Sequence, residues 1–310
     1  MTSEMNETLR ELEALRQALV KKLTITLIVL IVLFSGVALS FQSPFAIIGG
    51  LIFSFFIFGL LQKGSASGYV AEFKSRIIGS LVKSINTDLN YHPKRSISER
   101  EFEHAGLFQR PDRFKGEDLV EGQIEKTSLR FSEVHAEDRR TSTNSKGHTT
   151  TKYVTIFRGL FFQIDFHKNF SHETRIFPDI AENLFGKFGQ ALQKMGDIFK
   201  KGELVKLENV HFEKEFAVYS TNQIEARYIL SPSMMERLLS YKNRSRGRIW
   251  VAFHDSQMSL AMEVNKNLFE PPIWSSLLKT DLISEYQNDL EFATDIVEEL
   301  NLNTRIWTKE

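Results

Sequence analysis

The chain has 310 residues, and its 39 basic and 39 acidic side chains give a formal net charge of zero. This balance gives no support for nucleic-acid binding, which normally leaves a basic excess. The chain contains no cysteine, which excludes disulfides, thiol nucleophiles, iron–sulfur clusters and cysteine-ligated zinc. Its 26 phenylalanines favour a core rich in β-strands.

Residues 1–22 are predicted to form an N-terminal amphipathic helix. Apolar side chains recur there at steps of three and four residues, at Met5, Leu9, Leu12, Leu15 and Leu19. This stripe is shorter than the three or more heptads that an independent coiled coil needs. It suits contact with a second copy of the chain, in a homo-oligomer, or packing onto the same chain, and the sequence leaves both open.

Residues 23–62 contain no charged side chain, and lysines bracket them on both sides. A helix of about 40 residues rises about 60 Å, which is close to twice the thickness of a ~30 Å hydrocarbon core. Pro44 disfavours one unbroken helix. We therefore predict a transmembrane helical hairpin that spans the lipid bilayer twice, with spans at Leu23–Phe41 and Phe45–Leu61.

Two alternatives to the hairpin are a cleaved signal sequence with one span and a core hairpin of a soluble protein. A signal sequence has a shorter apolar region and a small-residue cleavage site. A soluble hairpin would show a wide polar face at helical spacing. The basic residues lie outside the hairpin, at Lys21, Lys22 and Lys63, and not in its turn. The positive-inside rule then predicts that both flanks are cytoplasmic.

Residues 63–310 are predicted to be a cytoplasmic α+β domain with a mainly antiparallel sheet, because regular strand–helix alternation is missing. In its first part, up to residue 152, the predicted elements are a flexible joint at 64–68, helices at 69–90 and 98–106, strands at 119–124 and 129–134, and a loop at 138–152. Residues 153–167 are predicted to be strand that Gly159 divides or bends. The later elements are helices at 178–200, 222–230, 232–241 and 281–300, and strands at 204–207, 216–219, 249–253 and 258–264.

The chain has no phosphate-binding loop, nucleophile elbow or H-E-x-x-H motif. Two groupings of histidine with carboxylate are His167 and His172 with Asp165 and Glu173, and His254 with Asp255. The first has ligand types that zinc accepts, and the second has the types of an acid–base pair. Both fall where polar residues are common, at a strand end and a tight turn. We therefore predict no metal site, no cofactor and no identifiable catalytic residue, and enzymatic activity stays open.

Two further sets of charged residues are candidates for a role. Arg227 lies in an apolar segment and is predicted to form a structural ion pair with Glu213 or Glu215, the alternative being an exposed charge. A basic cluster follows the helix predicted at 232–241, at Lys242, Arg244, Arg246 and Arg248. These cations favour the negative end of that helix, and they also suit contact with anionic lipid headgroups.

Three stretches together resemble a family of bacterial membrane proteins known only as domain of unknown function 3137. They are TSLRFSEVHAE at 127–137, FRGLFFQIDF at 157–166 and the segment at 205–238, and LFEPP at 268–272 fits as well. The resemblance implies two spans followed by a cytoplasmic domain, in a multi-pass protein of the bacterial inner membrane. It also implies a LemA-type membrane protein as a partner. It supplies no catalytic residues.

The sequence thus favours a membrane-anchored protein whose cytoplasmic domain binds another protein or the membrane surface. Two alternatives stay open. A membrane-tethered hydrolase would show a polar pocket with converging histidine and carboxylate groups. A domain that binds lipid or a small ligand would show a cavity lined by phenylalanine.

Overall fold

The computed structural model describes residues 3–40, 44–143, 145, 147–166, 169–178, 202–245, 247–300 and 302. The chain divides into two compact units. The helical unit comprises Met1–Leu81 and Phe269–Asn288, and the sheet unit comprises Val82–Leu268 and Asp289–Glu310. Residues 63–81 therefore group with the apolar helices that precede them.

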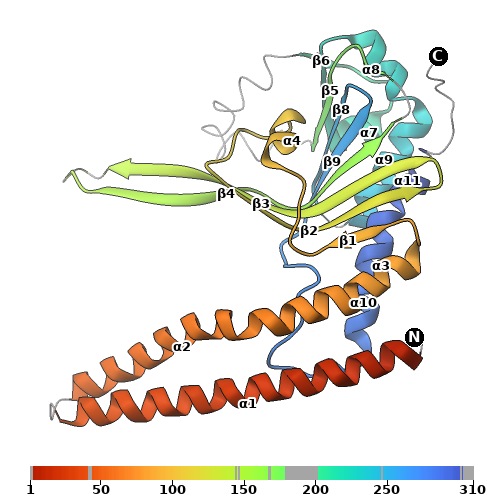
Figure 1. The fold of residues 1–310 in the computed structure, drawn as a ribbon. Helices are drawn as coiled ribbons and strands as arrows, with labels where there is room; N and C mark the ends of the chain where they lie inside the picture. The colour runs from red at the N-terminus through yellow and green to blue at the C-terminus, as the bar shows by residue number, and fades with distance from the viewer. Residues whose placement is uncertain are drawn as a thin grey trace. The chain divides into compact units, whose positions relative to one another are not determined.

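Two long helices dominate the helical unit, α1 at Ser3–Leu39 and α2 at Pro44–Phe73, and they lie side by side (Figure 1). After Phe73 the helix continues as a π-helical turn, η1 at Lys74–Ile78, and then as α3 at Gly79–Ile85. The flexible joint predicted at 64–68 is wrong, because α2 runs through it. Ala66 and Tyr69 are buried there, and their packing outweighs the low helix propensity of the two glycines.

The apolar parts of α1 and α2 leave large side chains exposed. Phe45 is 83% exposed and Ile52 is 66% exposed, whereas the polar Ser54 is fully buried. The Ser54 hydroxyl donates to the carbonyl oxygens of Gly50 and, across the helix pair, of Leu30, at 2.8 and 3.1 Å. Both helices are long and apolar enough to cross a membrane.

The amphipathic start of α1 packs within the helical unit. Leu9, Leu12 and Leu19 are buried, and Arg76 of η1 forms an ion pair with Glu11 at 2.6 Å. The segment from Phe269 onward joins this unit through Tyr69, whose hydroxyl donates to the carbonyl of Pro272 at 3.0 Å. Helix α10, at Thr280–Thr294, follows that segment.

The described residues of the sheet unit form a nine-stranded antiparallel sheet, in the order β1-β2-β3-β4-β9-β8-β5-β7-β6. The strands are β1 Asn90–His92, β2 Arg113–Ile124, β3 Thr127–Thr143, β4 Thr149–Asp165, β5 Thr174–Pro178, β6 Glu203–Val205, β7 Phe216–Ser220, β8 Ile249–His254 and β9 Gln257–Glu263. This arrangement confirms the predicted α+β class with an antiparallel sheet.

The helices of the sheet unit are α4 Glu99–His104, α7 Val210–Glu215, α8 Gln223–Ile229, α9 Pro232–Ser245 and α11 Ile296–Glu299, with the end of α10. Helix α4 begins with a capping box, in which Ser98 and Glu101 each accept from the other's backbone N–H. Its Phe102 makes ring contacts with Phe108, Phe114, Phe157 and Phe161, so that phenylalanines fill this core. The helix predicted at 178–200 lies outside the described residues, apart from Pro178, which ends β5.

Strands β3 and β4 differ from the prediction in two ways. The predicted loop at 138–152 is mostly strand, because the pairing continues to Thr143 opposite Thr149. This β3–β4 ribbon extends beyond the neighbouring strands (Figure 1). Gly159 neither divides nor ends β4. Its φ is +151°, and a Cβ there would lie 2.0 Å from the carbonyl oxygen of Met262 in β9. The glycine therefore permits close pairing of β4 with β9.

Candidate functional site

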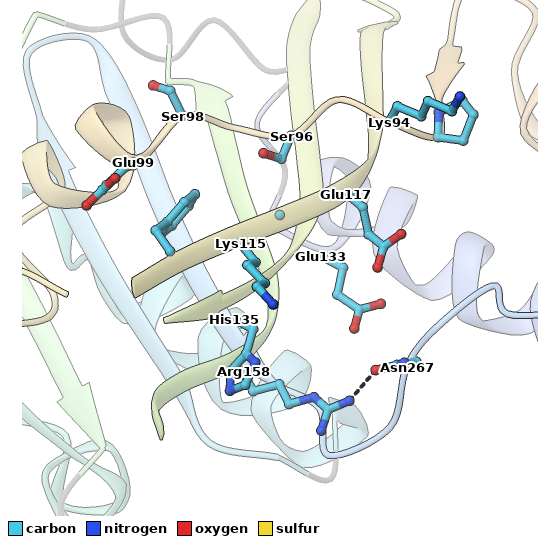
Figure 2. A pocket seen from close by; sticks show the side chains of 13 residues that line it. Lys94, Ser96, Ser98, Glu99, Lys115, Glu117, Glu133, His135, Arg158 and Asn267 are labelled. Atoms are coloured by element: carbon cyan, nitrogen blue, oxygen red, sulfur yellow. Dashed lines mark hydrogen bonds between the residues drawn. The ribbon is translucent and has the colours of Figure 1, made fainter. Parts of the chain in front are cut away.

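A polar cleft of about 670 Å³ lies in the sheet unit, between residues 93–99 and strands β2, β3 and β4. Figure 2 shows the side chains that line it. The charged and polar ones include Lys94, Ser96, Glu99, Lys115, Glu117, Glu133, His135, Arg158 and Asn267.

The cleft forms because β2 is paired unevenly. β1 pairs only with residues 119–121 of β2, so among the described strands only β3 pairs with residues 113–117. The segment at 93–99 passes this part of β2 and is held by two hydrogen bonds. The backbone N–H of Leu119 donates to the carbonyl of Arg95 at 3.0 Å, and the backbone N–H of Ile97 donates to the Ser132 hydroxyl at 3.1 Å. Gly116 lets it come close, because a Cβ there would lie 2.5 Å from the Cβ of Ser96.

One end of the cleft carries a row of basic side chains, defined by Lys115, His135 and Arg158. The register places Lys115 of β2 opposite His135 of β3, and His135 opposite Arg158 of β4. Residues directly opposite each other share one face of a sheet, and like charges in that position are destabilising. Arg158 donates to the Asn267 side chain, and His135 lies 3.0 Å from the hydroxyl of Thr155. Lys115 forms no ion pair with any described residue.

An acidic pair lies two positions along the same strands. Glu117 of β2 is opposite Glu133 of β3. Glu133 is buried, and one of its oxygens accepts from the backbone N–H of Leu268 at 2.9 Å. Two residues along a strand correspond to about 6.8 Å. The cleft therefore presents positive and negative charge about one dipeptide apart (Figure 2).

This arrangement offers charged groups of both signs to a ligand. A ligand of complementary charge can form charge-assisted hydrogen bonds with either set. The basic row suits a carboxylate or another anion, and the acidic pair suits an ammonium or guanidinium group. Ser96 also lines the cleft and supplies a hydroxyl that can donate or accept.

The structure corrects the ion pair predicted for Arg227. Arg227 is exposed, and its guanidinium donates to the Gln223 side chain at 3.1 Å and to the carbonyl of Lys206 at 3.2 Å. Glu213 instead accepts from the backbone N–H of Leu207 at 2.9 Å, and Glu215 pairs with Lys242. The exposed guanidinium bonds to Gln223, one turn earlier in α8, and to the loop after β6, and both glutamates have other partners.

Ion pairs balance the charge of the predicted basic cluster. Lys242 pairs with Glu215 at 2.5 Å, and Arg248 pairs with Glu263 at 2.6 Å. Arg244 reaches Asp295 at 3.1 Å and Glu299 at 2.9 Å. Arg246 lies outside the described residues. Contact with anionic lipid by the three described cations would compete with these carboxylates.

Sequence reasoning did not identify the cleft. Its lining extends from Pro93 to Asn267 and depends on which residues of three strands lie opposite each other. The only local signal is the alternation of Lys115 with Glu117, which places both on one face of a strand. Of the histidine groupings, His167 lies outside the described residues, whereas His254 and Asp255 lie at the β8–β9 turn as predicted.

The fold defines an α+β domain with a polar cleft, in a chain that also has two long apolar helices. Residues 155–302 match the family described as "Protein of unknown function (DUF3137)". This match confirms the family resemblance found in the sequence over these residues.

Two further comparisons add little. No curated protein matches the chain. The crystal structure of the mycobacterial trehalose monomycolate transport factor A, TtfA, is similar over 72% of this chain and 96% of that one, with 11% sequence identity and a TM-score of 0.35. A similarity at that TM-score carries no conclusion about this chain.

Proposed function

We propose that the chain is an integral membrane protein whose sheet unit binds a charged segment of a protein partner in the polar cleft. The observation that carries the binding proposal is the row of Lys115, His135 and Arg158 beside the pair of Glu117 and Glu133. Membrane anchoring rests on a separate observation, the exposed apolar side chains of α1 and α2.

The membrane proposal follows from the cost of exposing apolar surface to water. Soluble proteins rarely expose a continuous apolar patch larger than a few hundred Å². In α1 and α2, large exposed side chains extend over most of both apolar segments, and they include Ile25, Val32, Val37, Phe45, Ile52, Phe56 and Leu60. Lipid would cover these side chains at no such cost, with spans at Leu23–Phe41 and Phe45–Leu61.

Both flanks of the hairpin would lie on the cytoplasmic side of a bacterial inner membrane. The basic residues Lys21 and Lys22 precede the first span, and the chain after Gln62 continues on that side. Protease added to intact spheroplasts is expected to leave the sheet unit undigested, and protease added to inverted vesicles is expected to digest it. The reverse pattern would contradict the orientation, and release of the chain by alkaline carbonate would contradict the spans.

A protein segment fits the cleft better than a lipid tail does. Residues 113–117 of β2 form an edge with which no described strand but β3 pairs, and the segment at 93–99 packs close to it at Gly116. An extended peptide can add to such an edge through backbone hydrogen bonds and use alternate side chains for specificity. Opposite charges at positions i and i+2 of the peptide would meet the basic row and the acidic pair.

The test is site-specific photo-crosslinking of the full-length chain in native membranes, with a photoreactive residue in place of Lys94 at the cleft. We expect one saturable crosslinked product. Replacing both Lys115 and Arg158 with Gln should remove it, because the basic row loses two charges. The matched control is Lys126→Gln, which removes an exposed lysine at the β2–β3 turn and should leave the product unchanged.

Two results would contradict the binding proposal. One is the absence of any product from position 94. The other is an unchanged product in the double variant when its melting temperature equals that of the unmodified chain. The first candidate for the identity of the product is a LemA-type membrane protein, the partner class that the family resemblance implies.

A further inference from the structure

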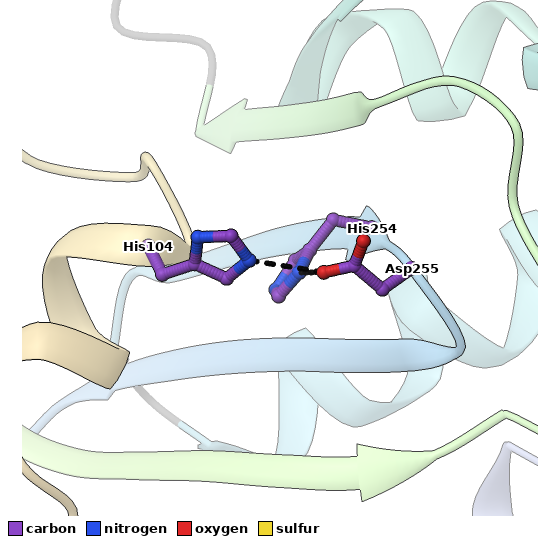
Figure 3. Close-up of side chains that lie close together, drawn as sticks. All are labelled: His104, His254 and Asp255. Atoms are coloured by element: carbon purple, nitrogen blue, oxygen red, sulfur yellow. Dashed lines mark hydrogen bonds and ion pairs between the residues drawn. The ribbon is translucent and has the colours of Figure 1, made fainter.

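A second polar cluster lies in the sheet unit, and none of its members lines the cleft. Figure 3 shows that His104, at the end of α4, faces His254 and Asp255 at the β8–β9 turn. His104 Nε2 lies 2.9 Å from Asp255 Oδ2, and His254 Nδ1 lies 3.2 Å from the same oxygen. The two nitrogens and the carboxylate oxygen all lie within 4.8 Å of one another.

The two separations from Asp255 Oδ2, 2.9 and 3.2 Å, are close to those between ligands of a tetrahedral zinc site. Zinc binds histidine nitrogen at about 2.0–2.1 Å and carboxylate oxygen at about 2.0–2.2 Å, so two ligands of one ion lie about 3.3 Å apart. Three protein ligands leave the fourth position for water or substrate. His104 is 63% exposed and Asp255 is 72% exposed, so an ion can enter from solvent.

A neighbouring hydroxyl orients the buried histidine. His254 Nε2 lies 3.0 Å from the hydroxyl of Ser259 in β9. When an ion replaces the proton on Nδ1, the proton on Nε2 can be donated to that hydroxyl. Metal-binding histidines typically use their second nitrogen in this way.

Asp255 supplies the carboxylate oxygen of this cluster. The guanidinium of Arg175 lies beside Gly106, in the turn after α4, and pairs with Glu173.

We propose that His104, His254 and Asp255 bind one divalent transition-metal ion of the zinc type, with a coordination position open to solvent. The proposal is independent of the cleft and of its protein ligand. Three ligands and an open position are the arrangement of catalytic zinc sites, whereas structural sites have four protein ligands.

The experiment uses the full-length chain in detergent, carrying a tag without histidine and stripped of metal with EDTA. Zn²⁺ is titrated by calorimetry, and Co²⁺ is titrated while its visible absorption is recorded, because that absorption reports nitrogen and oxygen ligands in a tetrahedral field. We expect one ion per chain. His104→Ala and Asp255→Asn should each weaken Zn²⁺ binding at least tenfold and reduce the Co²⁺ absorption.

The matched control is His92→Ala. His92 is a partly exposed histidine whose Nε2 lies 3.2 Å from a carboxylate oxygen of Glu121. That pair contains only one histidine, so His92→Ala should leave the Zn²⁺ affinity unchanged. His104 is exposed and asparagine tolerates the φ of +54° at position 255, so both test variants are expected to fold. Failure of the unmodified chain to bind Zn²⁺, or equal affinity in His104→Ala, would overturn the proposal.

Discussion

Arg16 lies one helical turn after Glu13, and its guanidinium donates two hydrogen bonds to that carboxylate, at 2.9 and 2.7 Å. The two residues are only 9% and 5% exposed. Each also reaches the segment after Leu268, because Arg16 donates to the carbonyl of Ile273 at 2.8 Å and Glu13 accepts from the N–H of Leu277 at 2.9 Å. Through these bonds the pair connects the amphipathic start of α1 to the segment at 273–277.

Glu13→Gln should therefore destabilise the helical unit. The change leaves the buried guanidinium of Arg16 without its counter-charge, and the loss of one partner of a buried pair costs about 3–5 kcal/mol. The measurement is the thermal unfolding of the full chain in detergent. The control is Glu7→Gln, an exposed glutamate of the same helix, which should change stability by less than about 0.5 kcal/mol. Equal effects of the two changes would show that the pair is not buried in the folded protein.

Ser54 provides a test of how α1 and α2 pack. Its hydroxyl is buried and bonds to the backbone of both helices. Ser54→Ala should cost about 0.6 kcal/mol, the average for a hydrogen bond between membrane helices. Ser54→Leu should cost about 1–3 kcal/mol, because the larger side chain has no space. Thr24→Leu, at an exposed position of α1, is the control. If Thr24→Leu and Ser54→Leu lower the stability in detergent by the same amount, this packing of α1 against α2 is contradicted.

Gly159→Ala is expected to disrupt the centre of the sheet. A Cβ would lie 2.0 Å from the Met262 carbonyl oxygen and 2.6 Å from the Val264 nitrogen, both backbone atoms of the neighbouring chain segment. Neither atom can move without breaking the β4–β9 pairing, so a large loss of melting temperature is expected. Gly68→Ala is the control with the opposite sign. Gly68 lies in α2 with open space around it, and alanine in a helix is more stable than glycine by about 0.5–1 kcal/mol. A mild effect at position 159 would contradict the close strand pairing.

The pair of Arg248 and Glu263 predicts a dependence of stability on pH. The Arg248 guanidinium donates two hydrogen bonds to this carboxylate and lowers the pKa of Glu263. The unfolded chain therefore takes up the proton at a higher pH than the folded chain does. The stabilisation is complete above the unfolded pKa of about 4.3, and it is lost as the pH falls through the folded pKa.

Glu263→Gln should flatten the acid part of the stability curve between neutral pH and about pH 3. The side chains of Arg248 and Glu263 are partly exposed, so the effect is expected to stay below about 1 kcal/mol. Melting temperatures measured across this range test it. Glu208→Gln, which removes an exposed carboxylate, is the control. If stability depends on pH in the same way in Glu263→Gln as in the unmodified chain, the pair of Arg248 and Glu263 does not contribute to acid stability.

Local patterns determined the elements that short-range interactions stabilise. The uncharged run from Leu23 to Gln62 became the apolar parts of α1 and α2. Ser98 and Glu101 became the capping box of α4, and the strands around Asp255 became the β8–β9 hairpin. In each case the deciding hydrogen bonds join residues a few positions apart, so the sequence pattern contained the information.

Tertiary structure alone decided where chemistry could occur. Lys115, His135 and Arg158 form a row only because of the register of three strands, and His104 meets His254 only because α4 packs beside the β8–β9 turn. Packing likewise decided that Arg227 bonds to a carbonyl and that α2 continues through two glycines. These outcomes depend on contacts between residues far apart in the chain, whose energies compete across the whole fold, and no local period or spacing records them.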